Sequence, residues 1–241
     1  MVVPWNPNPK QAWVAAHPVL PLDNGDRLDA EEFLRRYDTM PGVKKAELVH
    51  GIVYMPSPVF IEQHGEPDSL AQGWLLNYAI ATPGTRSATN STTRLGPDDV
   101  PQPDGLLRIL PECGGQSRVE DKILGGAPEL AFEVAASSVS LDSHAKKQVY
   151  EAAEMREYIL WRTLDGAVDW WTRRDEGFVA IAPGEDGILR SEVFPGLWLD
   201  PVALLEGDGL RVMAVLNAGL ASADHKAFVE RLRTVAAASS R

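Results

Sequence analysis

The run Pro128-Glu129-Leu130-Ala131-Phe132-Glu133-Val134 decides the fold. Its apolar residues form a short, nearly continuous stretch, which is typical of a strand buried on both faces at the centre of a sheet. A carboxylate, Glu133, nevertheless lies near the end of this run. An acid at the end of a buried strand is held rigidly and still reaches solvent. The run therefore predicts a central strand that also carries a functional side chain.

Two neighbouring segments bring further charged residues toward this strand. A strand-like run over 102–110 precedes it and begins near Asp104, and a helix over 140–153 follows it and carries Lys146. A strand–strand–helix path of this kind can bring the ends of its elements to one place. We therefore expect Asp104, Glu133 and the ammonium of Lys146 to converge on one point, with the rest of the chain as scaffold.

The helix after the strand carries three polar side chains on one face, because Asp142, Lys146 and Tyr150 are spaced four residues apart. This spacing has a purely structural explanation. Asp142 would cap the helix and pair with Lys146, which contributes roughly 0.2–0.5 kcal/mol, and Tyr150 would pack in the core. That explanation does not account for Glu133 just before the helix, so a role for Lys146 beside this acid is the alternative.

Two carboxylates and a lysine at one point suit a hard divalent cation. Mg²⁺ prefers oxygen ligands and commonly takes one or two carboxylates, with waters and substrate phosphates completing its shell. Asp104 and Glu133 would be the carboxylates, and the backbone carbonyl of Val134 could add a ligand. Lys146 would orient the attacking water or stabilise charge that develops on phosphorus. Strand-end acids and a helix lysine are also common without such a site, so the spacing alone leaves both interpretations open.

Length and composition indicate one ordinary folded domain with short additions, since 44% of the 241 residues are hydrophobic and 24% are charged. No run of 18 apolar residues is present, so we expect no membrane span. Residues 1–8 lack the basic patch and apolar stretch of a secretory signal. The single cysteine, Cys113, excludes an internal disulfide and a cysteine-based zinc cluster. We therefore expect a cytoplasmic protein.

The net charge of −11 bears on the kind of partner. Affinity for DNA comes largely from Lys and Arg side chains that neutralise phosphates. The charge therefore argues against a broad phosphate-binding surface. It does not exclude an enzyme that acts on nucleic acid, because an acidic metal pocket raises the acid count and a local basic strip can coexist with an acidic exterior.

The chain divides into three parts. Residues 1–25 are rich in proline and read as an irregular N-terminal arm, 26–203 as the folded domain, and 204–241 as a helical C-terminal extension. The fold class is α/β (α+β), with a mixed central sheet flanked by helices and extra edge strands. Outside the central segments we expect a helix at 29–37 that Asp29 can cap. We also expect a hairpin at 46–55, a helix within 60–81, a strand at 85–93, an exposed loop at 111–127, strands at 157–162 and 167–172, and edge strands at 178–181 and 190–194.

A series of short motifs runs along most of the chain. In order they are Glu47-Leu48-Val49-His50-Gly51, Met55-Pro56-Ser57-Pro58, His64, Gln102-Pro103-Asp104, the run from Gly126 to Val134, Asp142 with Lys146 and Tyr150, Arg156-Glu157-Tyr158, and Pro195-Gly196-Leu197. No single motif is specific, but their order and spacing over 29–200 resemble the Uma-two family of "putative restriction endonucleases" within the PD-(D/E)XK nuclease superfamily. The resemblance implies a restriction-endonuclease-like fold and a phosphodiesterase site that uses Mg²⁺, with Mn²⁺ as a substitute. It also implies DNA as the substrate.

The resemblance also assigns roles to residues. Asp104 and Glu133 become metal ligands together with the Val134 carbonyl, Lys146 becomes the catalytic lysine, and Glu47 becomes a supporting acid. Around them, His64, Asp142 and Tyr150 form a second layer. For His64 a structural histidine is an equal alternative, and Lys147 is a reserve for Lys146. A homodimer is expected, because a nuclease that cuts both strands usually needs two sites.

Two departures from the pattern support a competing hypothesis. The usual lysine position of the superfamily, two residues after the acid, is Ala135 here, and the Ser-Pro-Ser of the family reads Ala136-Ser137-Ser138. The competing hypothesis is an inactive protein that keeps the nuclease fold as a binding or oligomerisation module. A third hypothesis is a metal-assisted hydrolase of small phosphate esters. Because both acids and a lysine are present, we favour the active endonuclease.

Overall fold

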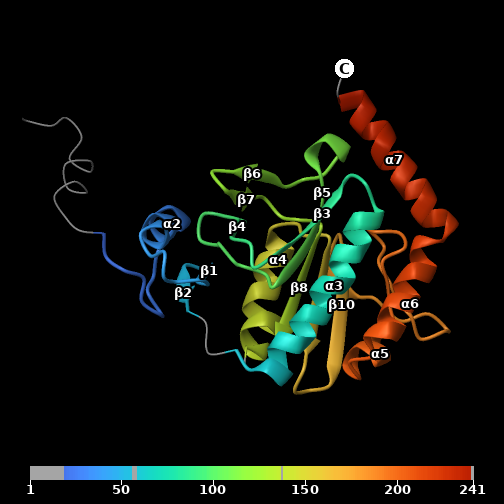
Figure 1. The fold of residues 1–241 in the computed structure, drawn as a ribbon. Helices are drawn as coiled ribbons and strands as arrows, with labels where there is room; N and C mark the ends of the chain where they lie inside the picture. The colour runs from blue at the N-terminus through green and yellow to red at the C-terminus, as the bar shows by residue number, and fades with distance from the viewer. Residues whose placement is uncertain (1–18, 56–58, 137, 240–241) are drawn as a thin grey trace, which may run out of the picture.

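A computed structural model describes residues 19–55, 59–136 and 138–239 of the chain. At its centre is a six-stranded sheet with the order β11-β10-β9-β8-β5-β3 (Figure 1). Every neighbouring pair is antiparallel except β8 and β9. A parallel pair needs a crossover, and the helical segment between these two strands supplies it. The strands are β3 (Thr85–Thr89), β5 (Gly105–Ile109), β8 (Leu130–Ala135), β9 (Glu157–Arg162), β10 (Ala167–Arg174) and β11 (Gly177–Ala180).

Strand β8 is buried along its whole length, which confirms the central strand predicted from its apolar run. Phe132 and Val134 face the larger apolar core on one side of the sheet. Ala131 and Ala135 face a smaller core on the other side. Successive side chains of a strand point to opposite faces, so Glu133 lies on the side of the smaller core.

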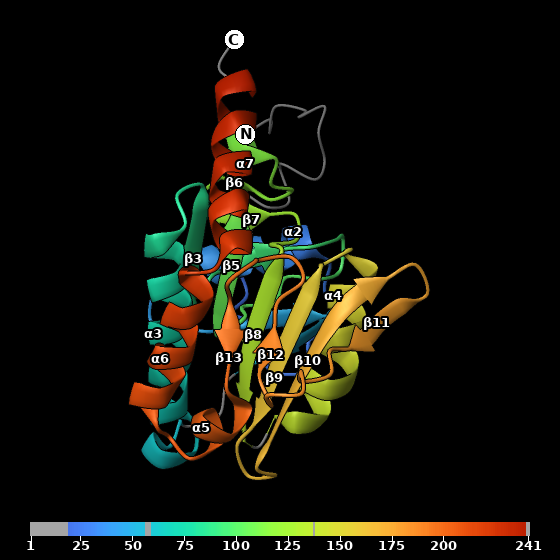
Figure 2. The same ribbon diagram turned by 90° about the vertical axis from the view of Figure 1, so that its right-hand side faces the viewer.

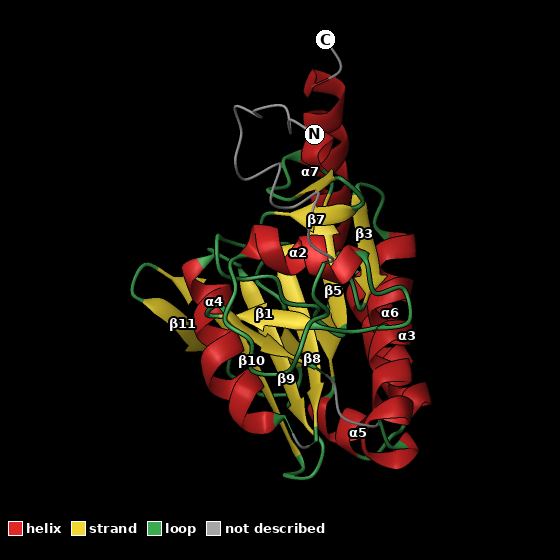
Figure 3. Ribbon diagram, turned by 90° about the vertical axis from the view of Figure 1, so that its left-hand side faces the viewer, coloured by secondary structure: helices red, strands yellow, loops and turns green. Residues whose placement is uncertain are grey.

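Helices cover both faces of the sheet (Figures 2 and 3). On the large-core face, α3 buries Trp74 against Phe132 and Trp170 at ring-centroid distances of 6.3 and 5.9 Å. The opposite face carries a π-helical turn that continues into α4. Besides these, a π-helical turn precedes α3. The bounds are Ile61–Gly65 for that turn, Glu66–Ala81 for α3, Leu141–Lys146 for the second π-helical turn, Lys147–Ala152 for α4, Pro201–Leu205 for α5, Gly209–Leu220 for α6 and Ala223–Ser239 for α7.

A helix–hairpin unit lies beside the main sheet (Figure 1) and consists of α2 (Ala30–Asp38), β1 (Glu47–Val49) and β2 (Ile52–Tyr54). Asp29 caps α2 as predicted, because its side chain accepts a hydrogen bond from the Glu32 N–H at 2.8 Å. The predicted hairpin is also present. His50 and Gly51 both have positive φ, as a two-residue turn of this hand requires.

The helix–hairpin unit has its own apolar cluster, and backbone hydrogen bonds are among the contacts that attach it to the body. Phe33 is fully buried in this cluster, and Leu22 packs there as well. Of the predicted N-terminal arm, residues 1–18 lie outside the described residues. Leu48 and Val100 exchange backbone hydrogen bonds of 3.1 and 2.8 Å. These two hydrogen bonds fix β1 against the segment that leads into β5.

Three predicted elements differ from the structure. The strand expected over 85–93 ends at Thr89, because Asn90 adopts a positive φ of 46° and turns the chain. The loop expected over 111–127 contains a short 3₁₀ turn and two strands, which form a second sheet with β4. The edge strand expected over 190–194 is only two residues long and pairs with β13. The bounds are Pro111–Cys113 for the turn, Thr93–Arg94 for β4, Arg118–Glu120 for β6, Ile123–Gly125 for β7, Leu189–Arg190 for β12 and Trp198–Leu199 for β13.

The C-terminal helices are part of the main core. Leu216 of α6 and Phe228 and Leu232 of α7 all belong to the cluster that covers one face of the sheet. Gly196, with a φ of 88°, lets the turn before β13 approach α6 and α7 closely, since a Cβ there would lie 2.9 Å from the Gly219 carbonyl oxygen. Among the described helices, none combines the length and apolar character needed to cross a membrane.

Candidate active site

Asp104 and Glu133 meet where β5 and β8 run side by side. The pairing of Gly105 with Phe132 places the preceding Asp104 opposite Glu133. The Val134 N–H donates to Asp104 Oδ2 at 3.0 Å, and the Asp104 N–H points to Glu133 Oε2 at 3.4 Å. Both carboxylates are buried, with 3% and 2% of the residue exposed. The sheet register therefore holds the two acids together.

Lys146 reaches the same place from the π-helical turn. Its ammonium lies 2.6 Å from Glu133 Oε1, 2.9 Å from Glu47 Oε1 and 3.2 Å from Asp142 Oδ1. Only 2% of its side chain is exposed. The structure thus brings Asp104, Glu133 and Lys146 together, with Glu133 touching the other two. The lysine comes from the helix side, and Ala135 packs in the smaller core.

The other residues singled out by the sequence also lie in this cluster. The Tyr150 hydroxyl donates to Glu133 Oε1 at 2.6 Å. Glu47 accepts the Gln102 N–H at 2.7 Å, which fixes the hairpin acid against the strand segment. The His64 Nε2 atom lies 3.3 Å from Asp104 Oδ2. His64 projects from the π-helical turn before α3. The acid pair is therefore surrounded by this turn, by β1 and by the helical segment after β8.

Sequence reasoning missed two neighbours of Asp104. Lys45 is not among the predicted site residues, and its ammonium lies 2.8 Å from Asp104 Oδ1. Gln72 of α3 donates to the Asp104 carbonyl oxygen at 2.8 Å. A signal for Lys45 was present, because it precedes Glu47 by two residues and side chains two apart in extended chain share a face. Gln72 has no comparable signal in the sequence.

Lys147 and the loop after β8 are the remaining sequence candidates. The Lys147 ammonium lies 4.1 Å from the ring centroid of Trp171, on the outer side of the small core. It is therefore not a substitute for Lys146. Ser137, in the loop where the chain departs from the family pattern, lies outside the described residues, as do residues 56–58 of the Met-Pro-Ser-Pro motif.

The surroundings of Asp104 keep it ionised. Burial alone would raise the pKa of its carboxyl group, but the hydrogen bond from His64 and the charges of Lys45 and Lys146 outweigh burial and hold the pKa well below its usual range. The hydrogen bond to Asp104 in turn raises the pKa of His64. A protonated imidazole next to an ionised carboxylate is the arrangement that these shifts favour.

Glu133 and Lys146 form a tightly coupled buried pair. Burial raises the pKa of Glu133, and the charge of Lys146 opposes this while nearby Asp104 adds to it. For Lys146, burial would lower the pKa, but the carboxylates of Glu133 and Glu47 raise it well above its ordinary value. Lys146 therefore stays protonated. The acids around it compete for the stabilising effect of its positive charge.

The donor atoms at this point fit a hard divalent cation. In an antiparallel pair the N–H and C=O of one residue face the same neighbouring strand, so the Val134 carbonyl points to the side on which its N–H meets Asp104. Among the described residues, no group of three or more His, Cys, Asp or Glu side chains has metal-binding geometry. Mg²⁺ does not require one, because two carboxylates with backbone, water and substrate oxygens suffice.

Comparisons with known proteins indicate the family and the fold. A family model described as "Putative restriction endonuclease", Uma2, matches residues 30–203. Among solved structures, a "putative nuclease belonging to DUF820" from Anabaena variabilis is similar in fold. Its TM-score is 0.55 at 14% sequence identity, over 72% of this chain and 97% of the other. Comparison with curated proteins finds no match. The family match covers most of the folded chain, and the chain therefore belongs to the Uma2 family, described as putative restriction endonucleases.

Proposed function

We propose that the protein is a metal-dependent endonuclease that hydrolyses phosphodiester bonds in DNA. The observation that carries this proposal is the meeting of two buried carboxylates, Asp104 and Glu133, with the ammonium of Lys146 at the end of two neighbouring strands. The description of the family as restriction endonucleases supports the choice of DNA. Hydrolysis adds water across one P–O ester bond and leaves a phosphate monoester and a hydroxyl group.

In this proposal Asp104, Glu133 and the Val134 carbonyl would hold Mg²⁺, or Mn²⁺ in its place. The ion would polarise a phosphoryl oxygen and lower the pKa of a bound water. The chain supplies the positioning. Lys146 and Tyr150 both bind Oε1 of Glu133, which leaves Oε2 on the side of Asp104.

His64 has a supporting role in the same proposal. Its Nε2 proton lies toward Asp104 Oδ2, so the imidazole keeps this carboxylate ionised and oriented. About a quarter of the His64 side chain is exposed (23%), so it can also meet the substrate. Cutting both strands of a duplex would use two such sites, and sedimentation velocity tests the homodimer that this implies.

Isosteric substitutions test the proposal. Asp104→Asn and Glu133→Gln remove a charge from each ligand while keeping the shape of the side chain. We expect each to reduce Mg²⁺-dependent cleavage of supercoiled plasmid by about 100-fold or more, with the circular dichroism spectrum unchanged. Asp38→Asn, an exposed acid in the last turn of α2, is the matched control and should cleave like the wild type.

Two outcomes would contradict the endonuclease. The first is a wild-type protein that cleaves no form of DNA, supercoiled, linear or single-stranded, with Mg²⁺ or Mn²⁺. The second is a calorimetric Mg²⁺ titration with no binding that depends on Asp104 and Glu133. Either result would favour an inactive nuclease fold that serves as a binding or oligomerisation module.

A further inference from the structure

We infer that Lys45 is the lysine that contacts the phosphate of the substrate, and that Lys146 is a positioning residue for Glu133. This inference rests on the proposed endonuclease function and changes which lysine would touch DNA. It comes from a difference between the two ammonium groups, which lie on either side of the acid pair but differ in their partners and in their access to solvent.

Lys146 has no hydrogen-bond donor left for a substrate. An ammonium carries three N–H groups and no acceptor. Three carboxylates, those of Glu133, Glu47 and Asp142, lie within 2.6, 2.9 and 3.2 Å of the Lys146 ammonium. With 2% of the side chain exposed, neither water nor phosphate can reach it without displacing one of these acids. The structure therefore gives Lys146 the task of holding Glu133.

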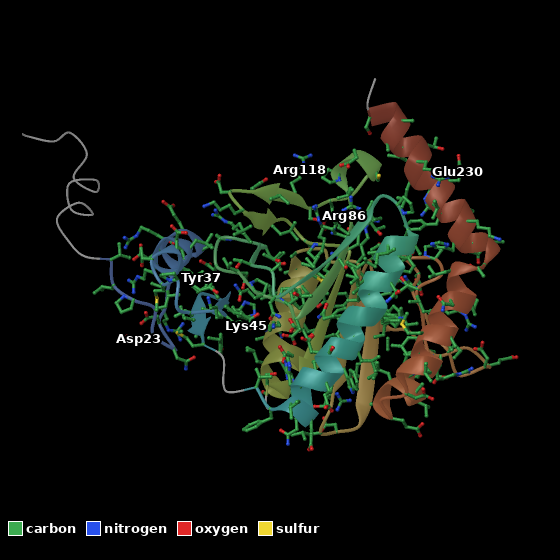
Figure 4. The ribbon with its side chains drawn as sticks, viewed as in Figure 1. Asp23, Tyr37, Lys45, Arg86, Arg118 and Glu230 are labelled. Atoms are coloured by element: carbon green, nitrogen blue, oxygen red, sulfur yellow. The ribbon has the colours of Figure 1, made fainter. Side chains whose placement is uncertain are left out.

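Lys45 differs from Lys146 both in its free hydrogen-bond donors and in its exposure to solvent. Within the described part of the chain its ammonium has one hydrogen-bond partner, Asp104 Oδ1 at 2.8 Å. Two of its three N–H groups therefore stay available. Its side chain is 23% exposed, compared with 4% for Asp104. Figure 4 shows Lys45 where the helix–hairpin unit faces the main sheet. Lys45 thus stands beside the acid pair with open donors.

The chemistry of lysine suits this position. Lysine binds phosphate as a compact point charge, and a cation beside the reacting phosphate stabilises negative charge that develops on its oxygens. The surroundings also require it, since the chain carries a net charge of −11 and four acids, Asp104, Glu133, Glu47 and Asp142, crowd this place. Lys45 would add a positive charge for the phosphate to that of His64, which lies 3.3 Å from the other oxygen of Asp104.

The salt dependence of DNA binding tests the contact without relying on cleavage. A short DNA duplex is titrated with Ca²⁺ replacing Mg²⁺, at several salt concentrations. Loss of one phosphate contact lowers the slope of log K against log salt by roughly 0.9. We expect this loss in Lys45→Met and its recovery in Lys45→Arg. Lys44→Met, which removes the neighbouring exposed lysine, should keep the wild-type slope.

Activity and stability complete the test. We expect Lys45→Met to reduce kcat with Mg²⁺ by about 100-fold. Lys146→Met should instead lower the melting temperature and keep the salt slope. The inference is overturned if Lys45→Met retains both the wild-type slope and kcat, or if Lys44→Met loses as much slope. A wild type that does not cleave overturns the endonuclease, and the salt slope still decides the Lys45 contact. If Lys146→Met does not fold, the Lys45 variants decide alone.

Discussion

The carboxylate of Glu133 receives two short contacts on the same oxygen atom, one from Tyr150 and one from Lys146. Tyr150→Phe separates them, because it removes the hydroxyl and leaves the ring, which packs 5.0 Å from the ring of Tyr158. A hydrogen bond to a charged group contributes roughly 1.5–3 kcal/mol. We expect the free energy of unfolding in urea to fall by that amount, and DNA cleavage to fall with it. An unchanged urea midpoint would show that the hydroxyl does not hold the acid.

Glu157 is a buried acid outside the candidate site, and it has a structural role. Its two carboxylate oxygens accept hydrogen bonds from four donors. The backbone N–H groups of Glu192 and Val193 lie 2.7 and 3.1 Å from Oε1, and Ser191 and Trp170 bind Oε2. These contacts fix the turn that carries the chain from β12 toward β13.

Glu157 gives the protein a stability that depends on pH. Burial raises the pKa of Glu157 from an ordinary 4.5 to about 7, against the opposing hydrogen bonds. The folded state therefore binds this proton more tightly than the unfolded state. The contribution to stability is full below pH 4.5 and is lost as pH rises through about 7, a change of roughly 3 kcal/mol.

Glu157→Gln removes this proton while leaving all other acids in place. We expect the difference in unfolding free energy, wild type minus variant, to shrink steadily as the pH rises from 5 to 8. Urea denaturation at four pH values measures it. A difference that stays constant with pH would mean that the four donors keep Glu157 ionised throughout.

Many individual residues of the candidate site could be predicted from the sequence. Asp104 and Glu133 could be found because each is an acid at the end of an apolar strand. Lys146 could be found because it shares a helix face with Tyr150. Lys45 was missed as a neighbour of Asp104 because the sequence shows only a short basic pair, Lys44-Lys45, that could lie at the surface or touch a phosphate backbone. Its partner, Asp104, lies 59 residues away, and only the docking of the hairpin onto the strand segment brings the two together.

Among the elements, the helix–hairpin unit has a small apolar core of its own. Its cluster is separate from the two cores of the main sheet. Phe33 is fully buried there, 5.6 Å from the ring of Tyr37. Segments with few buried contacts open first, below the free energy of global unfolding. Lys45 and Glu47 belong to this unit, so its opening would remove both from the site.

Phe33→Ala tests that dependence. Truncating a buried phenylalanine costs about 3–5 kcal/mol, which we expect to exceed the stability of the unit alone. Hydrogen exchange should become fast in α2, β1 and β2 while β8 and β9 stay protected, and cleavage should be lost. Leu20→Ala, at a residue 60% exposed, serves as the control. Uniform loss of protection across both parts would show that the unit unfolds only with the whole domain.

Elements with a strong local pattern could be predicted, and those created by distant contacts could not. The run of β8 and the Asp29 cap of α2 are local, and both predictions were correct. The segment over 111–127 has no clear alternation. It is shaped by Glu129, which binds the N–H groups of Ile109 and Gln116 at 2.7 and 3.0 Å. Glu157 ends β12 in a similar way.

Over the whole molecule, the largest core extends without a break into the last helix. Phe228 of α7 packs 6.3 Å from the ring of Phe194, and Leu232 touches the turn at Gly84. Each such residue contributes about 2–5 kcal/mol, a large part of the roughly 5–15 kcal/mol that is typical of a domain.

Removal of α7 is therefore expected to prevent folding. A chain ending at Ser222 should show no cooperative thermal transition, whereas Arg233→Gln, on the exposed side of the helix, should melt like the wild type. Calorimetry makes the comparison. If the shortened chain still melted cooperatively near the wild-type temperature, α7 would be a separable addition.

The three acids around Lys146 come from segments that are far apart in the chain. Glu47 lies in the hairpin, Glu133 in the central strand and Asp142 in the turn after it. The Lys146 ammonium thus joins three segments, as a structural metal ion does. Its three partners are together only after the hairpin has docked. A partly folded chain therefore has neither Glu47 nor Lys45 in place. Under the proposed function, cleavage of DNA would then begin only when assembly is complete.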